Sequence, residues 1–171
     1  MNKEIKLIRD WAVMLHANQK YGEHDYVYHL DKVYELGLYF GLDDDYLMAA
    51  YLHDTIEDCQ VTKEDIETKA NKHIANMVWA VSGFGETRKE RKIDMIEKMY
   101  KYPASINLKL LDRCVNMMES KLNNPKLFQM YLKEMKDYEE VFKLGDSKIY
   151  QFLLNVCDID CINQNKKGLK L

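Results

Sequence analysis

The densest group of chemically active side chains is a short stretch from His53 to Asp58, which holds one imidazole and three carboxylates. It directly follows an apolar run of six residues. If one helix continues through both, Glu57 lies one turn after His53. Asp58 then lies one turn after Asp54, on the same side of the helix. Charges close to a core need partners, and a divalent metal suits a neutral His beside an Asp. The stretch therefore indicates a candidate metal site.

Two distant residues, His29 and Asp112, are candidates for the same site. Asp112 lies with Arg113 inside an apolar segment, where an unpaired carboxylate is strongly disfavoured. His29 belongs to the expected helix before the one that carries His53, and a short turn lets these helices pack antiparallel. Both residues also have an ordinary explanation, because a lone His is usually a core residue and a buried Asp usually pairs with an Arg such as Arg113. Residue types alone leave both explanations open.

Length and composition predict one globular domain over residues 1–171, with a core from about residue 3 to 156 and a frayed end at 163–171. The chain is 47% hydrophobic and 31% charged, and its formal net charge of −3 gives no general basic field for DNA or RNA. It has no apolar run of about eighteen residues and no signal peptide, so we expect a cytoplasmic protein without membrane contact. Its four cysteines lack the paired spacing of structural zinc sites.

Helical periodicity with only two prolines predicts an all-α fold, a helical bundle. A polar loop at residues 21–25 separates the first two helices. Acidic residues 43–45 and the pattern at 62–65 predict helix N-terminal caps. The expected helices cover residues 3–20, a segment around His29 that ends near residue 41, a segment from 43 through the acidic stretch, a short segment after 62, and residues 74–81, 87–100, 104–118, 126–144 and 149–156.

Three motifs in the same order resemble the HD-domain phosphohydrolase superfamily, and in particular its RelA/SpoT-type hydrolase branch. That branch extends its HD pair to HDxxED and closes with K-L-x-D-R-x-x-N. The resemblance spans about residues 11 to 134. A lone HD pair would carry little weight, whereas several motifs in order are a strong signal. The motifs are Tyr28-His29, then Leu52-His53-Asp54-Thr55-Ile56-Glu57-Asp58, then Lys109-Leu110-Leu111-Asp112-Arg113-Cys114-Val115-Asn116.

The resemblance implies a role for each matching residue. Residues that bind one divalent metal, commonly manganese, would be His29, His53, Asp54 and Asp112. Residues that position and deprotonate the attacking water would be Glu57 and Asp58. Residues that bind the substrate would be Lys20 and Arg88 on its phosphates and Asn116 and Tyr131 around the nucleotide. Mixed imidazole and carboxylate donors suit manganese, and basic side chains suit an anionic substrate.

Two positions depart from the pattern of this branch. Leu30 follows His29 where these hydrolases often have Pro, and Leu111 replaces the usual Ala of the closing motif. Neither change removes an implied ligand or base. The basic segment at residues 87–92 is less distinctive, because a solvated first turn of a helix explains it equally well.

The resemblance implies a metal-dependent nucleotide phosphohydrolase. Its sharpest form is a (p)ppGpp 3′-pyrophosphohydrolase, in which water attacks the phosphorus bonded to the 3′ oxygen. Alternatives within the enzyme class are a 5′-nucleotidase or a 2′/3′-phosphatase. A non-catalytic nucleotide sensor and a helical interaction protein are alternatives from other classes. The twelve Tyr residues suit either core packing or the face of a homo-oligomer.

Overall fold

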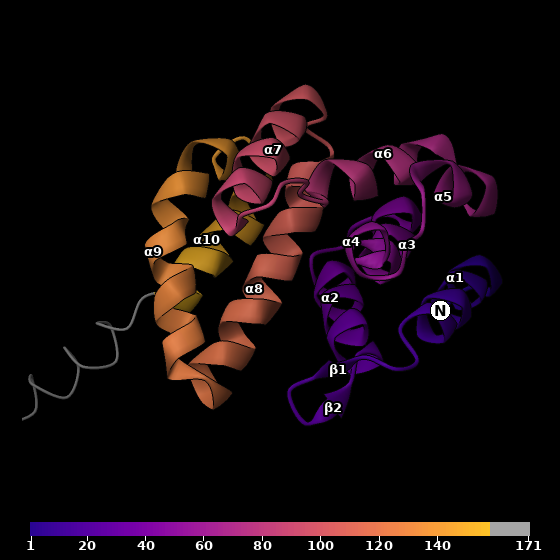
Figure 1. Ribbon diagram of the computed structural model, residues 1–171, viewed down its shortest axis with the longest axis horizontal. Coiled ribbons are helices and arrows are strands. Elements are labelled where there is room, and N and C mark those ends of the chain that lie inside the picture. Colours follow the sequence, from indigo (N-terminus) through magenta and orange to yellow (C-terminus); the bar gives the residue numbers. More distant parts are fainter. Residues whose placement is uncertain (158–171) are drawn as a thin grey trace, which may run out of the picture.

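The computed structural model describes residues 1–157, and within them the fold is all-α apart from one small hairpin (Figure 1). The predicted frayed end at residues 163–171 lies outside the described part of the chain. In chain order the elements are α1 (Lys3–Leu15), β1 (Lys20–Tyr21), β2 (His24–Asp25), α2 (Val27–Tyr39), α3 (Asp44–Leu52), α4 (Thr55–Asp58), α5 (Lys63–Lys69), α6 (Lys72–Val81), α7 (Arg88–Lys101), α8 (Ser105–Asn123), α9 (Pro125–Phe142) and α10 (Ser147–Cys157).

Helix α8 lies at the centre of the fold. It packs against α2, α3, α6, α9 and α10, and in Figure 1 it runs between α9 and α10 on one side and α2 and α3 on the other. A helix with neighbours on most sides buries most of its circumference. The expected charged pair, Asp112 and Arg113, is therefore buried, and each residue is 4% exposed. The apolar side chains that α8 buries are Ile106, Leu108, Leu110, Leu111, Cys114, Val115 and Met117.

Helix α3 is buried along most of its length, because α1, α2, α6 and α8 pack around it. Six consecutive residues, Leu47 to Leu52, are buried. The helix begins as predicted, since the Asp43 side chain accepts a hydrogen bond from Tyr46 N at 3.1 Å. The capping pattern predicted at residues 62–65 is also present and begins α5. Helix α3 thus delivers the residue after Leu52 into the interior.

The first helix and the following loop differ from the prediction. Helix α1 ends at Leu15 rather than at Lys20, and residues 20–25 form an antiparallel hairpin rather than an irregular loop. Gly22 has a φ of +59°, the left-handed conformation that a tight hairpin turn requires.

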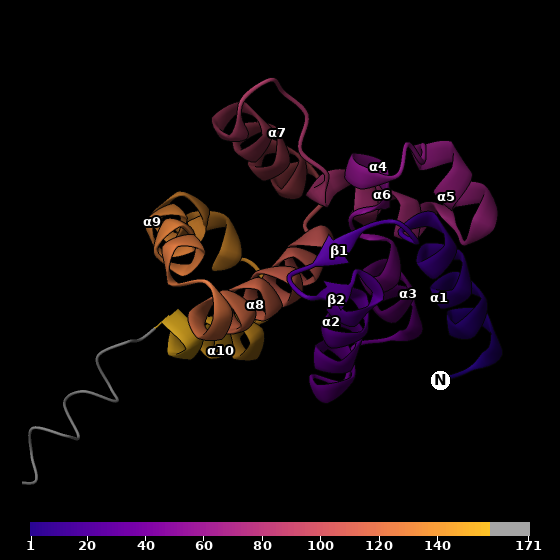
Figure 2. The same cartoon turned by 60° about the horizontal axis from the view of Figure 1, so that its bottom comes forward.

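Ring contacts with α2 account for this difference. Tyr21 stacks on His29 with ring centroids 4.6 Å apart, and His24 stacks on Tyr28 at 4.2 Å. These tertiary contacts hold the predicted loop against α2 as a hairpin, and helical periodicity carries no information about them. The hairpin lies beside the start of α2, which Figure 2 shows.

Apart from the helix predicted from residue 43 through the acidic stretch, the remaining predicted helices are confirmed, with shifts of a few residues at their ends and a longer α8, which extends to Asn123. Among the described helices, none is both long and apolar enough to cross a bilayer.

Candidate metal and phosphate site

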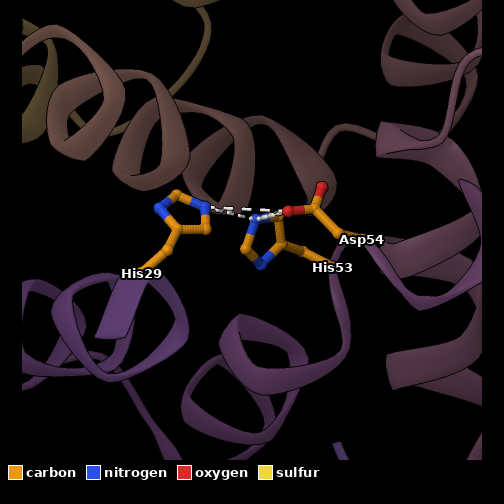
Figure 3. A group of neighbouring side chains, drawn as sticks. All are labelled: His29, His53 and Asp54. Carbon is orange, nitrogen blue, oxygen red and sulfur yellow. Dashed lines mark hydrogen bonds and ion pairs between the residues drawn. The ribbon is translucent and has the colours of Figure 1, made fainter. Parts of the chain in front are cut away.

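The His-Asp pair lies in a turn between two helices. We expected one helix to continue through residues 53–58, and that prediction is wrong, because α3 ends at Leu52 and α4 begins at Thr55. The buried Thr55 hydroxyl donates to Leu52 O at 2.7 Å, which satisfies a free carbonyl at the end of α3. The turn directs His53 and Asp54 toward His29 of α2 (Figure 3).

Four donor atoms converge at this turn. His29 Nε2 lies 3.1 Å from His53 Nε2, 3.6 Å from Asp54 Oδ2 and 3.4 Å from Asp112 Oδ1. His53 Nε2 lies 2.8 Å from Asp54 Oδ2 and 3.6 Å from Asp112 Oδ1. The structure therefore brings together all four residues predicted as metal ligands. They come from α2, from the turn after α3, and from α8.

The donor set fits a divalent metal. At metal–ligand bonds of about 2.1 Å, neighbouring ligands of an octahedral ion lie about 3 Å apart, which is close to the distances between these atoms. His53 Nδ1 lies 2.8 Å from Ala50 O. Because a carbonyl only accepts, Nδ1 donates this hydrogen bond, and Nε2 is the nitrogen left for a metal, which would bind there in place of a proton. Even without Asp112, the ligand atoms of His29, His53 and Asp54 all lie within 4.8 Å of one another and form a candidate metal-binding group.

The electrostatics of the cluster indicate a place for a cation. Burial alone would lower the pKa of His53, but the carboxylates of Asp54 and Asp112 raise it well above its ordinary value. Burial alone would raise the pKa of Asp112, whereas Lys109 and the two imidazoles hold it well below its usual range. The two ionised carboxylates beside the two buried imidazoles create a negative potential that favours a bound cation.

Several neighbours orient the ligands. Lys109 Nζ lies 2.8 Å from Asp112 Oδ2, and Asn116 donates to Asp112 Oδ1. The Tyr26 hydroxyl donates to Asp54 Oδ2 at 2.6 Å. Tyr21, which stacks on His29, donates to Asn116 Oδ1 at 2.9 Å. Sequence reasoning missed both tyrosines, and their position shortly before His29 was the only signal for them. Lys109 matched the closing motif without an assigned role.

The two predicted water-handling residues lie in different surroundings. Glu57 lines the pocket beside the metal ligands, and its Oε1 accepts a hydrogen bond from Gly83 N. Burial raises the pKa of Glu57, and the Gly83 N–H opposes that shift. Asp58 is absent from the described lining of this pocket. The pKa of Asp58 is raised overall, because burial and the Asp54 charge outweigh the opposing effects of His16 and of a hydrogen bond with Tyr26.

A pocket of about 300 Å³ adjoins the ligands. It contains three of the four predicted ligands, namely His29, Asp54 and Asp112. The predicted substrate residues Arg88, Asn116 and Tyr131 also line it. Its cationic side chains are Arg88, Arg91, Lys92, Lys109 and Arg113. The basic run at the start of α7 thus faces the site rather than only solvent.

Glu134 of α9 holds two of these cations. Arg88 binds it through Nε–Oε1 at 2.7 Å and Nη2–Oε2 at 3.1 Å, and Arg113 Nη1 lies 3.2 Å from Oε2. Arg113 therefore pairs with Glu134, and the basic partner of Asp112 is Lys109 instead. Both guanidinium groups lie over the Tyr131 ring, at 5.9 and 4.7 Å from its centroid. Nothing in the sequence distinguished Glu134 from the other charges of its helix.

A second cavity of about 560 Å³ shares Tyr21, Asn116 and Tyr131 with the first. Lys20 lines this second cavity and pairs with Asp25 at 2.5 Å. Lys20 is thus separated from the predicted metal ligands. It could contact only the part of a bound substrate that extends into the second cavity. The two cavities together reach from the metal ligands to the junction of α8 and α9.

Two curated relatives match parts of the chain. A guanosine-3′,5′-bis(diphosphate) 3′-pyrophosphohydrolase from Vibrio cholerae is 39% identical over 84 residues, which are 44% of this chain and 12% of the relative. A protein of the same name from Aquifex aeolicus is 30% identical over 122 residues, which are 67% of this chain and 17% of the relative. The chain thus spans less than a fifth of the length of either relative.

The fold is similar to that of a solved structure. A metazoan ortholog of SpoT, which hydrolyzes ppGpp and plays a role in starvation responses, superposes with a TM-score of 0.80 at 22% identity. The match covers 91% of this chain and 94% of that one. At this identity the likeness shows the all-α fold.

The protein-family model of the HD domain matches residues 9–107 of the chain. These residues include His29, His53 and Asp54 and end shortly before Asp112. The chain belongs to the HD domain family.

Proposed function

We propose that this protein is a metal-dependent nucleotide phosphohydrolase that removes pyrophosphate from the 3′ position of (p)ppGpp, with Mn²⁺ as its metal. One observation carries the proposal: the Nε2 atoms of His29 and His53 lie 3.1 Å apart, and each lies within 3.6 Å of an oxygen of Asp54 and of an oxygen of Asp112, at a pocket with five cationic side chains. The names of the two curated relatives support the choice of substrate.

The metal ligands in this proposal are His29, His53, Asp54 and Asp112. A divalent metal held there would supply Lewis-acid activation of water and of a phosphoryl oxygen. The chain's own part is to fix these four donors. Ala50 O sets the proton position of His53, and Lys109 and Asn116 fix the carboxylate of Asp112.

Glu57 is the proposed general base. It lies in the pocket, and its raised pKa brings it closer to the range in which a carboxylate accepts a proton effectively near neutral pH. Oxygen of the attacking water bonds to phosphorus, and its proton passes to Glu57. The bond from phosphorus to the 3′ oxygen breaks, pyrophosphate leaves, and the 3′ oxygen takes up a proton from water to become the 3′ hydroxyl. A part for Asp58 in the same step stays a prediction.

The cationic wall of the pocket is the proposed phosphate site. Arg88, Arg91 and Arg113 offer guanidinium donors, which bind phosphate oxygens in pairs. The adjoining cavity, with Asn116, Tyr131 and Lys20 in its wall, is the proposed place for the nucleoside and the remaining phosphates.

Purified protein, stripped of metal and reloaded with Mn²⁺, tests the proposal against a panel of nucleotides. The panel contains guanosine tetraphosphate, guanosine pentaphosphate, a 5′-mononucleotide and a 2′-phosphorylated nucleotide. We expect release of pyrophosphate from the first two compounds, and no release without metal.

Other outcomes would overturn parts of the proposal. Release of inorganic phosphate from the 5′-mononucleotide would indicate a nucleotidase. Tight binding of guanosine tetraphosphate without product over a long incubation would indicate a sensor. Equal activity with and without chelator would exclude the metal-dependent reaction.

A further inference from the structure

Glu57 is held in place by the loop between α6 and α7. Its Oε1 accepts a hydrogen bond from the backbone N–H of Gly83, which is buried. A Cβ on Gly83 would lie 2.6 Å from Arg91 O, so only glycine allows the loop to approach α7 this closely. The bond engages one of the two carboxylate oxygens.

Two side chains of α7 fix the loop on either side of Gly83. Lys98 donates to Ser82 O, and the Asp94 carboxylate accepts from Phe84 N at 2.9 Å. The two side chains also pair with each other, with Lys98 Nζ 2.7 Å from Asp94 Oδ2. The residues before and after Gly83 are thus bound by the two members of one ion pair.

Lys98 is unusual because it is a lysine whose side chain is buried. It is 3% exposed, and its ammonium group lies 4.6 Å from the centroid of the Trp79 ring and 4.2 Å from that of Phe84. A buried ammonium group is costly unless it is paired and hydrogen-bonded. Here a carboxylate, a carbonyl and two aromatic faces offset that cost, and together they tie α7 to the end of α6.

We propose that Lys98 and Asp94 are positioning residues, which fix the Gly83 N–H so that it holds the Glu57 carboxylate in its reactive orientation. The inference rests on the proposed function, in which Glu57 takes a proton from water. Neither residue belongs to the described lining of the pocket, so they act through the loop rather than on a substrate.

Substitution of Asp94 tests this inference, because its side chain is 36% exposed and a replacement is compatible with folding. Asp94→Ala removes the acceptor for Phe84 N and the partner of Lys98. Asp94→Asn keeps an acceptor oxygen for Phe84 N. We expect Asp94→Ala to lower kcat about tenfold, since a misplaced base loses part of its general-base contribution, while KM and Mn²⁺ affinity stay within about twofold. Asp94→Asn should recover part of the lost kcat.

The pH profile supplies a readout that a merely structural role would not move. The charged groups that interact with Glu57 are Lys109 of α8, which lowers its pKa, Asp54 and Asp58, which raise it, and Lys98 of α7, whose own pKa the Glu57 charge raises. A hydrogen bond from Gly83 N–H favours the ionised carboxylate, so its loss raises the pKa. Because the base must be ionised, the acidic limb of kcat/KM in Asp94→Ala should move to higher pH by about one unit.

A double variant separates this inference from the proposed function. In the Glu57→Gln background, Asp94→Ala should cause no further loss of the residual rate, because both changes act through the same carboxylate. Asp10→Ala is the matched control, since Asp10 forms an exposed ion pair with Lys6 at the same helical spacing on α1. It should leave kcat and the acidic limb unchanged.

Two results would overturn different statements. If Glu57→Gln abolishes turnover while folded Asp94→Ala and Lys98→Met keep the wild-type kcat and acidic limb, the positioning role is wrong and the proposed function stands. If Glu57→Gln itself keeps full turnover, the proposed base is wrong. Circular dichroism at the assay temperature establishes that each variant is folded.

Discussion

At the scale of single residues, Glu57 gives the most direct test of the proposed chemistry. It lies in the pocket but is not one of the four converging donors. Glu57→Gln keeps the size of the side chain and removes the base, so we expect kcat to fall by a factor of about 10² to 10⁴. Metal binding should persist, because no donor is lost. Pyrophosphate release and Mn²⁺ titration measure the two properties separately.

Glu67→Gln is the matched control for this prediction. Glu67 is exposed on α5, and the same substitution there should change neither property. Full Mn²⁺-dependent turnover in Glu57→Gln would contradict the assignment of the base. Loss of Mn²⁺ binding in that variant would show instead that Glu57 supports the metal site.

The four candidate ligands were predicted from the order of the family motifs, whereas residue types alone left an ordinary explanation open for His29 and Asp112. His53 and Asp112 are polar groups within buried segments, and such groups need partners. Glu134 could not be predicted in the same way. It is one of several charges on an amphipathic helix, and only the tertiary structure places it between Arg88 and Arg113. A motif thus indicates candidate ligands more readily than it indicates the groups that orient them.

At the scale of elements, helix ends that depend on tertiary structure could not be predicted from the sequence either. The segment around His53 has no Pro or Gly to mark a break, so continuous helix was the simplest prediction. The break depends on the hydroxyl of Thr55 bonding Leu52 O inside the core. Side-chain bonds of this kind compete with the helical pattern, and periodicity does not report them. Most helices, by contrast, could be predicted because their apolar stripes repeat at helical spacing.

Glu134 joins three elements, because it lies on α9 and binds Arg88 of α7 and Arg113 of α8. Burial would raise the pKa of Glu134, but the two guanidinium groups lower it below its ordinary value. A group whose pKa is lowered by folding stabilises the fold at pH values above its unfolded pKa. That contribution is lost as the pH falls through the folded pKa.

Glu134→Gln should therefore destabilise the protein by about 2 kcal/mol at pH 7, the usual size for a lost charge-assisted hydrogen bond. The difference in the free energy of unfolding between wild type and Glu134→Gln should become smaller once the pH falls below about 4.3, the ordinary pKa of a Glu. Urea unfolding at a series of pH values measures both effects. Glu140→Gln, which changes an exposed pair with Lys143, should leave the stability unchanged. Equal stability of wild type and Glu134→Gln at pH 7 would contradict the prediction.

At the scale of the whole molecule, the candidate metal site joins parts of the chain that are distant in sequence. His29 belongs to α2, His53 and Asp54 follow α3, and Asp112 belongs to the central helix α8. His29 and Asp112 do not stay near His53 and Asp54 in an unfolded chain, so a metal at the proposed site would bind the folded state and stabilise it. The proposed metal site therefore needs both distant residues in addition to the stretch at residues 53–58.

This dependence predicts a thermal shift. Free Mn²⁺ at 100 times its dissociation constant should stabilise the metal-free protein by about 2.7 kcal/mol. For a chain of this size, that corresponds to a rise in Tm of about 5 to 10 °C. His29→Ala and Asp112→Asn should each abolish the rise while leaving residues 53–58 unchanged. His73→Ala, which removes an exposed imidazole bonded to Tyr102, should retain it. A full shift in Asp112→Asn would exclude Asp112 from the metal site, because the remaining donors would then suffice to bind the ion.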